Sequence, residues 1–326
     1  MPVLRVHFTA QDLARTTIAA GPDPLWEVLL SLHQTQTRDG QATLGNWRRR
    51  ASRTPRGDLA LLRELAPPTG YSPDFLTPGG DGLGASLDAL ASTPPARLQT
   101  ELAYLATRTA ASPWTRDLGT GRAEAIRQLT GAVQSYYDTA LRPYWPSIRR
   151  HIANDRARRV DEMSRTGVEG VLSGLHPHIR WRAPVLEILD FANADLYLEG
   201  RGLVLQPSFF CWEAPTKLRD PSLPQTLVYS TAPPPGALEA SSGPAGLTAL
   251  LGRTRAVALE AVAGGCSTSE LARRCGVSLA SASQQATILR EAGLITTRRD
   301  GAAVRHEITA LGLHLLNGRS FSSRLS

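Results

Sequence analysis

Six of the ten residues from 278 to 287 carry uncharged side chains that can donate and accept hydrogen bonds, and none of the ten is charged. In a helix opened by Ser278, the apolar residues Ala282, Ala286 and Leu289 fall on one stripe, which leaves the polar side chains outward. Glutamine amides pair with N6 and N7 of adenine, and small hydroxyls suit any base edge, so this face predicts a helix that enters the major groove of double-stranded DNA. The alternative is a solvated helix with few charges. The residues expected to contact DNA are Ser278, Ala280, Ser281, Ser283, Gln284, Gln285 and Thr287.

Signals before this helix indicate that it is the second of a pair. Ser267 and Glu270 have capping-box spacing, so a helix is expected to begin there. Gly276 is placed to end that helix, and Ser278 can cap the next one. The preceding stretch GLTALLGRTRAVALEAVAGG predicts one further helix. This order of helices is typical of a helix-turn-helix.

A basic hairpin is expected directly after the polar helix. Two strand-like runs flank Asp300 and Gly301, a pair typical of two-residue hairpin turns. Arg298 and Arg299 enter the turn and Arg305 leaves it. We interpret the hairpin as a wing whose three arginines contact DNA phosphates or the minor groove.

The charge and the leucine content of the C-terminal segment indicate two kinds of partner, a nucleic acid and a second copy of the chain. Residues 247 to 326 hold ten arginines against five acids, a net charge of +5 out of +7 for the chain, as expected of a nucleic-acid module. The segment ALGLHLLNG predicts a final helix that is too rich in leucine for a short surface helix, so we expect a second copy of the chain to cover it. The residues predicted to form this homodimer contact are Leu247, Leu250, Leu251, Leu311 and Leu315.

The segments LGRTRAVALEAV and STSELARRCGVSLASASQQATILREAGLITTRRDGAAVRHEIT resemble the winged helix-turn-helix of the ArsR/SmtB family of transcriptional repressors, over about 75 residues. The segments FTAQDLARTTIA, PDPLWEVLLSLH and GRGLVLQPSFFCW resemble a long N-terminal extension that some of these regulators carry. The resemblance implies a homodimeric repressor that leaves an inverted-repeat operator when it binds an effector, here an unknown small molecule.

The chain departs from the metal sensors of that family. Their Cys-x-Cys box is replaced by Ser267 and Ser269, and a histidine pair of their recognition helix is replaced by Gln284 and Gln285. Cys266 alone lacks the second thiol that a soft-metal site needs. We therefore expect no metal at the standard site and no cofactor.

Residues 236 to 246, rich in Pro, Gly, Ser and Ala, are expected to link an N-terminal domain of residues 1–235 to a DNA-binding domain of residues 247–326. Gly200 and Gly202 predict a hairpin turn between two strands, and residues 226–231 predict another strand. The expected fold class is mainly α with small antiparallel β elements: a helical α+β domain, then a winged helix-turn-helix. N-terminal helices are predicted over residues 23–36, 57–66, 83–92, 95–111 and 121–142, and residues 146–175 predict one long helix or two abutting ones.

The N-terminal domain is expected to sense the effector. Its aromatic residues fit the lining of a ligand pocket, with core packing as the alternative. His176 and His178 have no nearby ligand that would complete a metal site. The pocket candidates are Tyr136, Trp145, Phe209 and Trp212.

Other classes of protein are disfavoured. No nucleophile elbow, phosphate loop, dinucleotide fingerprint or zinc-protease motif occurs, so we expect no catalytic residues and no enzymatic activity. Two alternatives stay open: a site built around Cys211, and a winged helix used only for protein contact. Three scattered cysteines and the lack of a long apolar stretch predict a soluble, cytoplasmic protein that does not bind membranes.

Overall fold

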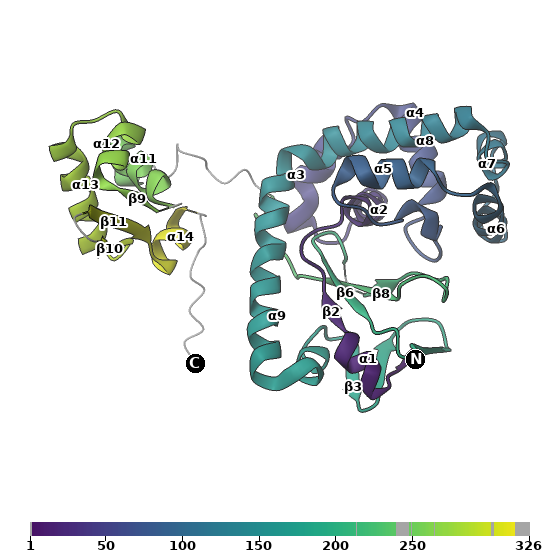
Figure 1. Ribbon diagram of the computed structural model, residues 1–326. Coiled ribbons are helices and arrows are strands. Elements are labelled where there is room, and N and C mark those ends of the chain that lie inside the picture. Colours follow the sequence, from purple (N-terminus) through teal and green to yellow (C-terminus); the bar gives the residue numbers. More distant parts are fainter. Residues whose placement is uncertain are drawn as a thin grey trace. The chain divides into compact units, whose positions relative to one another are not determined.

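The computed structural model describes residues 2–212, 214–238, 248, 250–263, 265–300 and 303–316. The chain divides into two compact units, Met1–Leu238 and Glu239–Ser326, each drawn in Figure 1. The boundary falls just after the predicted end of the N-terminal domain at residue 235. Most of the predicted linker, together with Leu247, lies outside the described residues.

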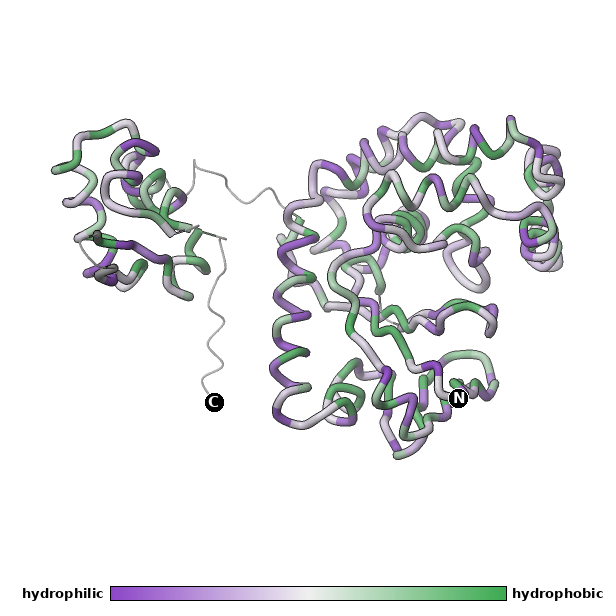
Figure 2. Tube along the Cα trace, in the orientation of Figure 1, coloured by the Kyte–Doolittle hydropathy of each residue, from purple (hydrophilic) through white to green (hydrophobic). Residues whose placement is uncertain are grey.

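A layer of helices forms the larger core of the N-terminal unit (Figure 1). The Asp23 carboxylate caps the first of them, α2, by accepting the N–H groups of Leu25 (2.8 Å) and Trp26 (3.0 Å). Figure 2 shows α2 as largely hydrophobic, in keeping with its burial among the other helices. The helices of this layer are α2 (Pro24–Gln34), α3 (Gln41–Ala51), α4 (Arg56–Leu65), α5 (Leu83–Ala91), α6 (Pro95–Ala106), α7 (Pro113–Gly119) and α8 (Ala123–Tyr136), with a 3₁₀ turn at Asp74–Leu76, a π-helical turn at Tyr137–Leu141 and a 3₁₀ turn at Arg142–Tyr144.

The long helix α9 (Trp145–Ser173) spans two cores of this unit. Ile148 and Ile152, near its start, are buried in the helical core. Val171 and Leu172, near its end, are buried in a second core that the sheets share. Gly167, with φ 71° and ψ −176°, interrupts the helix, so the segment expected to be one helix or two abutting ones consists of two pieces.

Two four-stranded sheets complete the unit, and both mix strand directions. In the first, with order β3-β4-β1-β5, β1 runs antiparallel to β4 and parallel to β5. In the second, with order β2-β6-β8-β7, β6 pairs in parallel with both neighbours and only β7 is antiparallel. The prediction of antiparallel elements therefore holds for β1 with β4, β3 with β4 and β7 with β8, and is wrong for the parallel pairings of β5 and β6. The remaining elements are β1 (Val3–His7), α1 (Ala10–Arg15), β2 (Thr17–Ile18), β3 (Ile179–Arg182), β4 (Val185–Leu189), β5 (Ala194–Tyr197), β6 (Val204–Ser208), β7 (Thr216–Lys217) and β8 (Thr226–Ser230).

The hairpin predicted at Gly200 and Gly202 does not form. The strands on either side, β5 and β6, belong to different sheets, and the glycines lie in the crossing between them. Gly202 has φ 80°, and a Cβ there would lie 2.6 Å from the carbonyl oxygen of Arg15. Its N–H donates to Asp12 Oδ1 at 3.0 Å. Glycine is thus required for close approach of two backbones rather than for a hairpin turn.

The C-terminal unit has a third core, built from helices around a three-stranded antiparallel sheet of order β10-β11-β9. Leu259, Leu271, Leu289 and Ile295 are among its fully buried residues. Across both units the chain is mainly helical with small sheets, which confirms the coarse fold class. The elements of this unit are α11 (Arg253–Val262), β9 (Cys266–Ser267), α12 (Thr268–Cys275), α13 (Leu279–Glu291), β10 (Ile295–Asp300), β11 (Ala303–Ile308) and α14 (Ala310–Leu316).

Candidate nucleic-acid interface

Local hydrogen bonds set the pair α12 and α13. Ser267 Oγ accepts the N–H of Glu270 at 3.2 Å, but the Glu270 carboxylate pairs with Arg274 instead of completing a capping box. α12 ends at Gly276, which adopts the left-handed conformation with φ 64°. Ser278 Oγ then accepts the N–H of Ser281 at 3.2 Å and opens α13. The turn between the helices is therefore built by residues that the sequence assigned to it.

α13 buries the predicted stripe and exposes the predicted face. Its buried residues are Ala282, Ala286 and Leu289, which pack in the core of the C-terminal unit. The outward surface carries no charge from residue 279 to residue 289. The residues predicted to contact DNA all lie on that surface, beside the exposed Leu279: Ser278, Ala280, Ser283 and Gln284 are exposed, and Ser281, Gln285 and Thr287 are half-buried.

The hairpin of β10 and β11 places two arginines side by side. Arg298 and Arg305 lie directly opposite each other in the register, both are exposed, and opposed residues share one face of the sheet. Arg305 approaches Glu307 at 3.8 Å, whereas Arg298 pairs with no acidic side chain that the structure describes. Like charges at opposed positions destabilise a hairpin, so this face is suited to a polyanion. The side chain of Arg299 and the turn residues 301–302 lie outside the described part.

A buried histidine ties the hairpin to α12. His306 Nε2 lies 2.9 Å from Thr268 Oγ1, and His306 Nδ1 lies 3.0 Å from Thr297 Oγ1. Burial, together with the positive charge of Arg290, lowers the pKa of His306 below its usual value. The neutral ring therefore joins α12, β10 and β11 near pH 7, which fixes the arginine pair relative to the helices. Nothing in the sequence around His306 indicates this anchoring role.

The predicted dimer residues divide into two groups. Leu250 and Leu311 are 68% and 50% exposed, as is their neighbour Leu313 at 41%. Leu251 and Leu315 are half-buried against the core of their own unit. An apolar surface is thus open on α14, at the positions of Leu311 and Leu313.

The four predicted pocket residues belong to the helical core of the N-terminal unit. Tyr136 and Phe209 are fully buried inside it, and the Tyr136 hydroxyl lies 3.0 Å from Ser31 Oγ. Trp145 and Trp212 pack against it from the edge. Their placement matches the alternative of core packing that the sequence left open.

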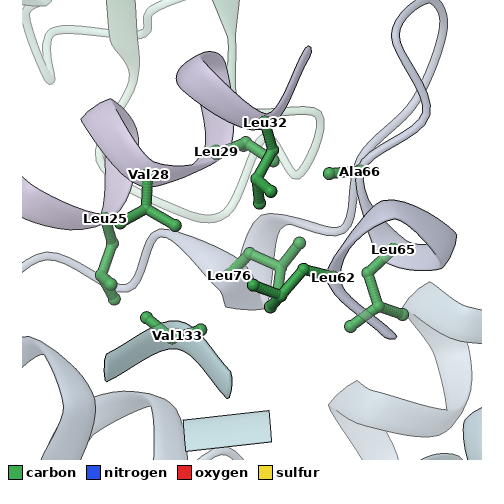
Figure 3. Close-up of a pocket in the computed structure, with 9 residues that line it drawn as sticks. All are labelled: Leu25, Val28, Leu29, Leu32, Leu62, Leu65, Ala66, Leu76 and Val133. Atoms are coloured by element: carbon green, nitrogen blue, oxygen red, sulfur yellow. The ribbon is translucent and has the colours of Figure 1, made fainter. Parts of the chain in front are cut away.

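Two hollows in the same unit are lined by other residues. Figure 3 shows an apolar cavity between α2, α4 and α8, with a volume of about 20 Å³, room for no more than about one water. A shallow groove of about 620 Å³ lies between α4 and α8. The cavity is lined by Leu25, Val28, Leu29, Leu32, Leu62, Leu65, Ala66, Leu76 and Val133, and the groove by Gly57, Asp58, Ala60, Leu61, Gln128, Gly131 and Ala132.

The remaining chemical candidates are isolated. Cys211 is buried, its thiol donates to the Ala214 carbonyl at 3.4 Å, and burial raises its pKa, which suppresses the nucleophilic thiolate. The rings of His176 and His178 meet edge to face, with centroids 5.5 Å apart. In the part of the chain that the structure describes, no three His, Cys, Asp or Glu residues gather where they could hold a metal ion.

Among the described helices, none combines the length and apolar character needed to cross a membrane. In comparisons with known proteins, no family model, no curated protein and no solved structure matches this chain.

Proposed function

We propose that the C-terminal unit is a winged helix-turn-helix that binds double-stranded DNA sequence-specifically. The observation that carries the proposal is the uncharged, hydrogen-bonding face of α13, followed along the chain by a hairpin with two exposed arginines on one face. α13 then serves as the recognition helix in the major groove, and the hairpin serves as the wing.

The two surfaces have different tasks in this proposal. Gln284 and Ser283, both exposed, read base edges, since an amide can make a bidentate pair with adenine. Arg298 and Arg305 bind phosphates, which supplies affinity without sequence information. Ser278 uses its oxygen to cap α13, so its hydroxyl is left to act on DNA as a donor.

We further propose a homodimer that acts as a transcriptional repressor. The open leucines of α14 supply the contact, and two recognition helices about 34 Å apart would read an inverted repeat. Release by a small-molecule effector bound to the N-terminal unit is part of the same proposal and rests on the ArsR/SmtB resemblance alone.

The test is selection of bound duplexes from a random pool by the full-length protein, followed by titration of the selected duplex against salt. Enrichment of an inverted repeat, with affinity that falls steeply as salt rises, is the expected result. Weak, salt-insensitive binding without enrichment would overturn the proposal and favour a winged helix used for protein contact.

A further inference from the structure

Leu279 is a large apolar side chain on the surface of α13. It is the first residue of the helix, directly after the cap Ser278, and it is 57% exposed. It is not part of the core of the C-terminal unit, whereas Val277 two residues earlier packs against that core. Folding of the unit therefore gives no reason for a leucine at this position.

The surroundings of Leu279 are small and uncharged. Ala280 and Ser283 are exposed on the same end of the helix, and no charged residue occurs before Arg290. Residues at the N-terminus of a recognition helix reach furthest toward base edges. If α13 enters the major groove as proposed above, Leu279 is among the side chains closest to the bases.

We infer that Leu279 contacts the 5-methyl group of thymine, so that each half-site of the preferred duplex carries an A·T pair at this position. This inference rests on the proposed function and adds a residue that selects the base. In the major groove, the thymine methyl is the apolar group that a base pair offers. Every other edge presents donors or acceptors, which a leucine would cover without replacing their hydrogen bonds to water.

Leu279 and Gln284, both on the outward surface of α13, are then expected to prefer the same base pair. Leu279 favours a methyl group, and Gln284 favours adenine, so both select A·T pairs. Selection from the random pool should therefore return half-sites with thymine at the position that meets the first turn of the helix.

The test replaces each thymine of the selected duplex, one at a time, by deoxyuridine, which removes the methyl group and leaves the base-pairing edge unchanged. For the parent protein, one position in each half-site should lose affinity by about three- to fourfold, the effect of one buried methyl. For Leu279→Ala, affinity for the thymine duplex should fall, and deoxyuridine at that position should have no further effect. Because Leu279 lies outside the core and alanine favours helices, this variant is expected to fold.

Arg298→Ala is the matched control, since it should weaken binding to thymine and deoxyuridine duplexes equally and keep the three- to fourfold ratio. The inference is overturned if deoxyuridine has no effect at any position with the parent protein, or if Leu279→Ala keeps the parent's sensitivity. Failure of the proposed function gives a different result, because the parent would then enrich no sequence in the initial selection.

Discussion

At the scale of single residues, the proposed DNA complex gives Gln284 and Arg298 different tasks, the first in reading sequence and the second in general affinity. Gln284 lies on the uncharged face of α13, whereas Arg298 lies on the exposed face of the hairpin. The two side chains therefore predict different losses when each is removed.

We expect Gln284→Ala to cost about 1 to 3 kcal/mol on the selected duplex and little on random DNA, because the lost contact is to one base pair. Arg298→Ala should weaken binding to both duplexes similarly. It should also reduce the slope of log affinity against log salt concentration by about one per protomer, because one phosphate contact is lost. Titrations of both duplexes at several salt concentrations measure these effects. Equal losses from Gln284→Ala on both duplexes would contradict the base-reading role.

Another single residue, Glu27, gives the N-terminal unit a pH dependence. Its carboxylate is fully buried and accepts the N–H groups of Phe209 (2.9 Å) and Phe210 (3.2 Å), which joins α2 to the segment after β6. Burial raises the pKa of Glu27 to about 7, against the lowering effect of the two N–H donors. The folded state therefore holds a proton that the unfolded chain releases near pH 4.5.

We expect Glu27 to contribute roughly 3 kcal/mol to the free energy of unfolding. This contribution should be fully present below pH 4.5 and should be lost as the pH rises through about 7. The free energy of unfolding of the parent should exceed that of Glu27→Gln by more at pH 5 than at pH 8. All six tryptophans lie between residues 26 and 212, so their fluorescence during urea unfolding reports on this unit alone. A difference between parent and variant that stays constant with pH would refute the assignment.

At the scale of elements, the turn between α12 and α13 depends on one glycine. Gly276 has φ 64°, and a Cβ at this position would meet no atom within 4 Å, so any cost of substitution is conformational. We expect Gly276→Ala to destabilise the helix pair by about 1 kcal/mol, and Gly276→Asn by less. Hydrogen exchange of the α12 and α13 amides in the full-length protein should accelerate by about fivefold for the alanine variant.

Gly131→Ala is a suitable control, because Gly131 lies inside α8 with open space around its Cα. Alanine should stabilise that helix slightly and leave exchange in α12 and α13 unchanged. Unchanged exchange in the Gly276→Ala variant would mean that the turn tolerates another backbone conformation.

The sequence predicted those elements whose signals are local. Caps at Ser267 and Ser278, the glycine between them and the apolar stripe of α13 all act within one or two helical turns, and the structure contains both helices. Helices α1, α3 and α7 were missed because they are short or, in α3, because three consecutive arginines from Arg48 to Arg50 obscure the apolar face.

Long-range pairing was not predictable in the same way. The parallel neighbours β6 and β8 are joined by no tight turn, so nothing in the intervening sequence indicates that they pair. At the candidate interface, Leu279 was missed because an isolated leucine after a cap is indistinguishable, in sequence, from one that packs in the core.

At the scale of the whole molecule, the open leucines of α14 predict self-association. We expect Leu311→Lys to weaken dimer formation at least tenfold, since the charge would have to be buried at the contact, while the half-exposed position lets the protomer fold. Sedimentation velocity over a range of protein concentrations measures the change. Val160→Lys, at a 41% exposed position of α9, is the control, and equal association of both variants would exclude α14 from the contact.

The position of β1 in its sheet governs the order in which the protein can fold during synthesis. β1 begins at Val3, yet it lies between β4 and β5, whose residues run from Val185 to Tyr197. At typical translation rates the ribosome needs roughly 10 to 40 s to reach those partners. During that interval the helices α2 to α8 can assemble, while the apolar side chains of β1 have no sheet to join. β1 therefore stays unpaired until its partners, from Val185 onward, have been made.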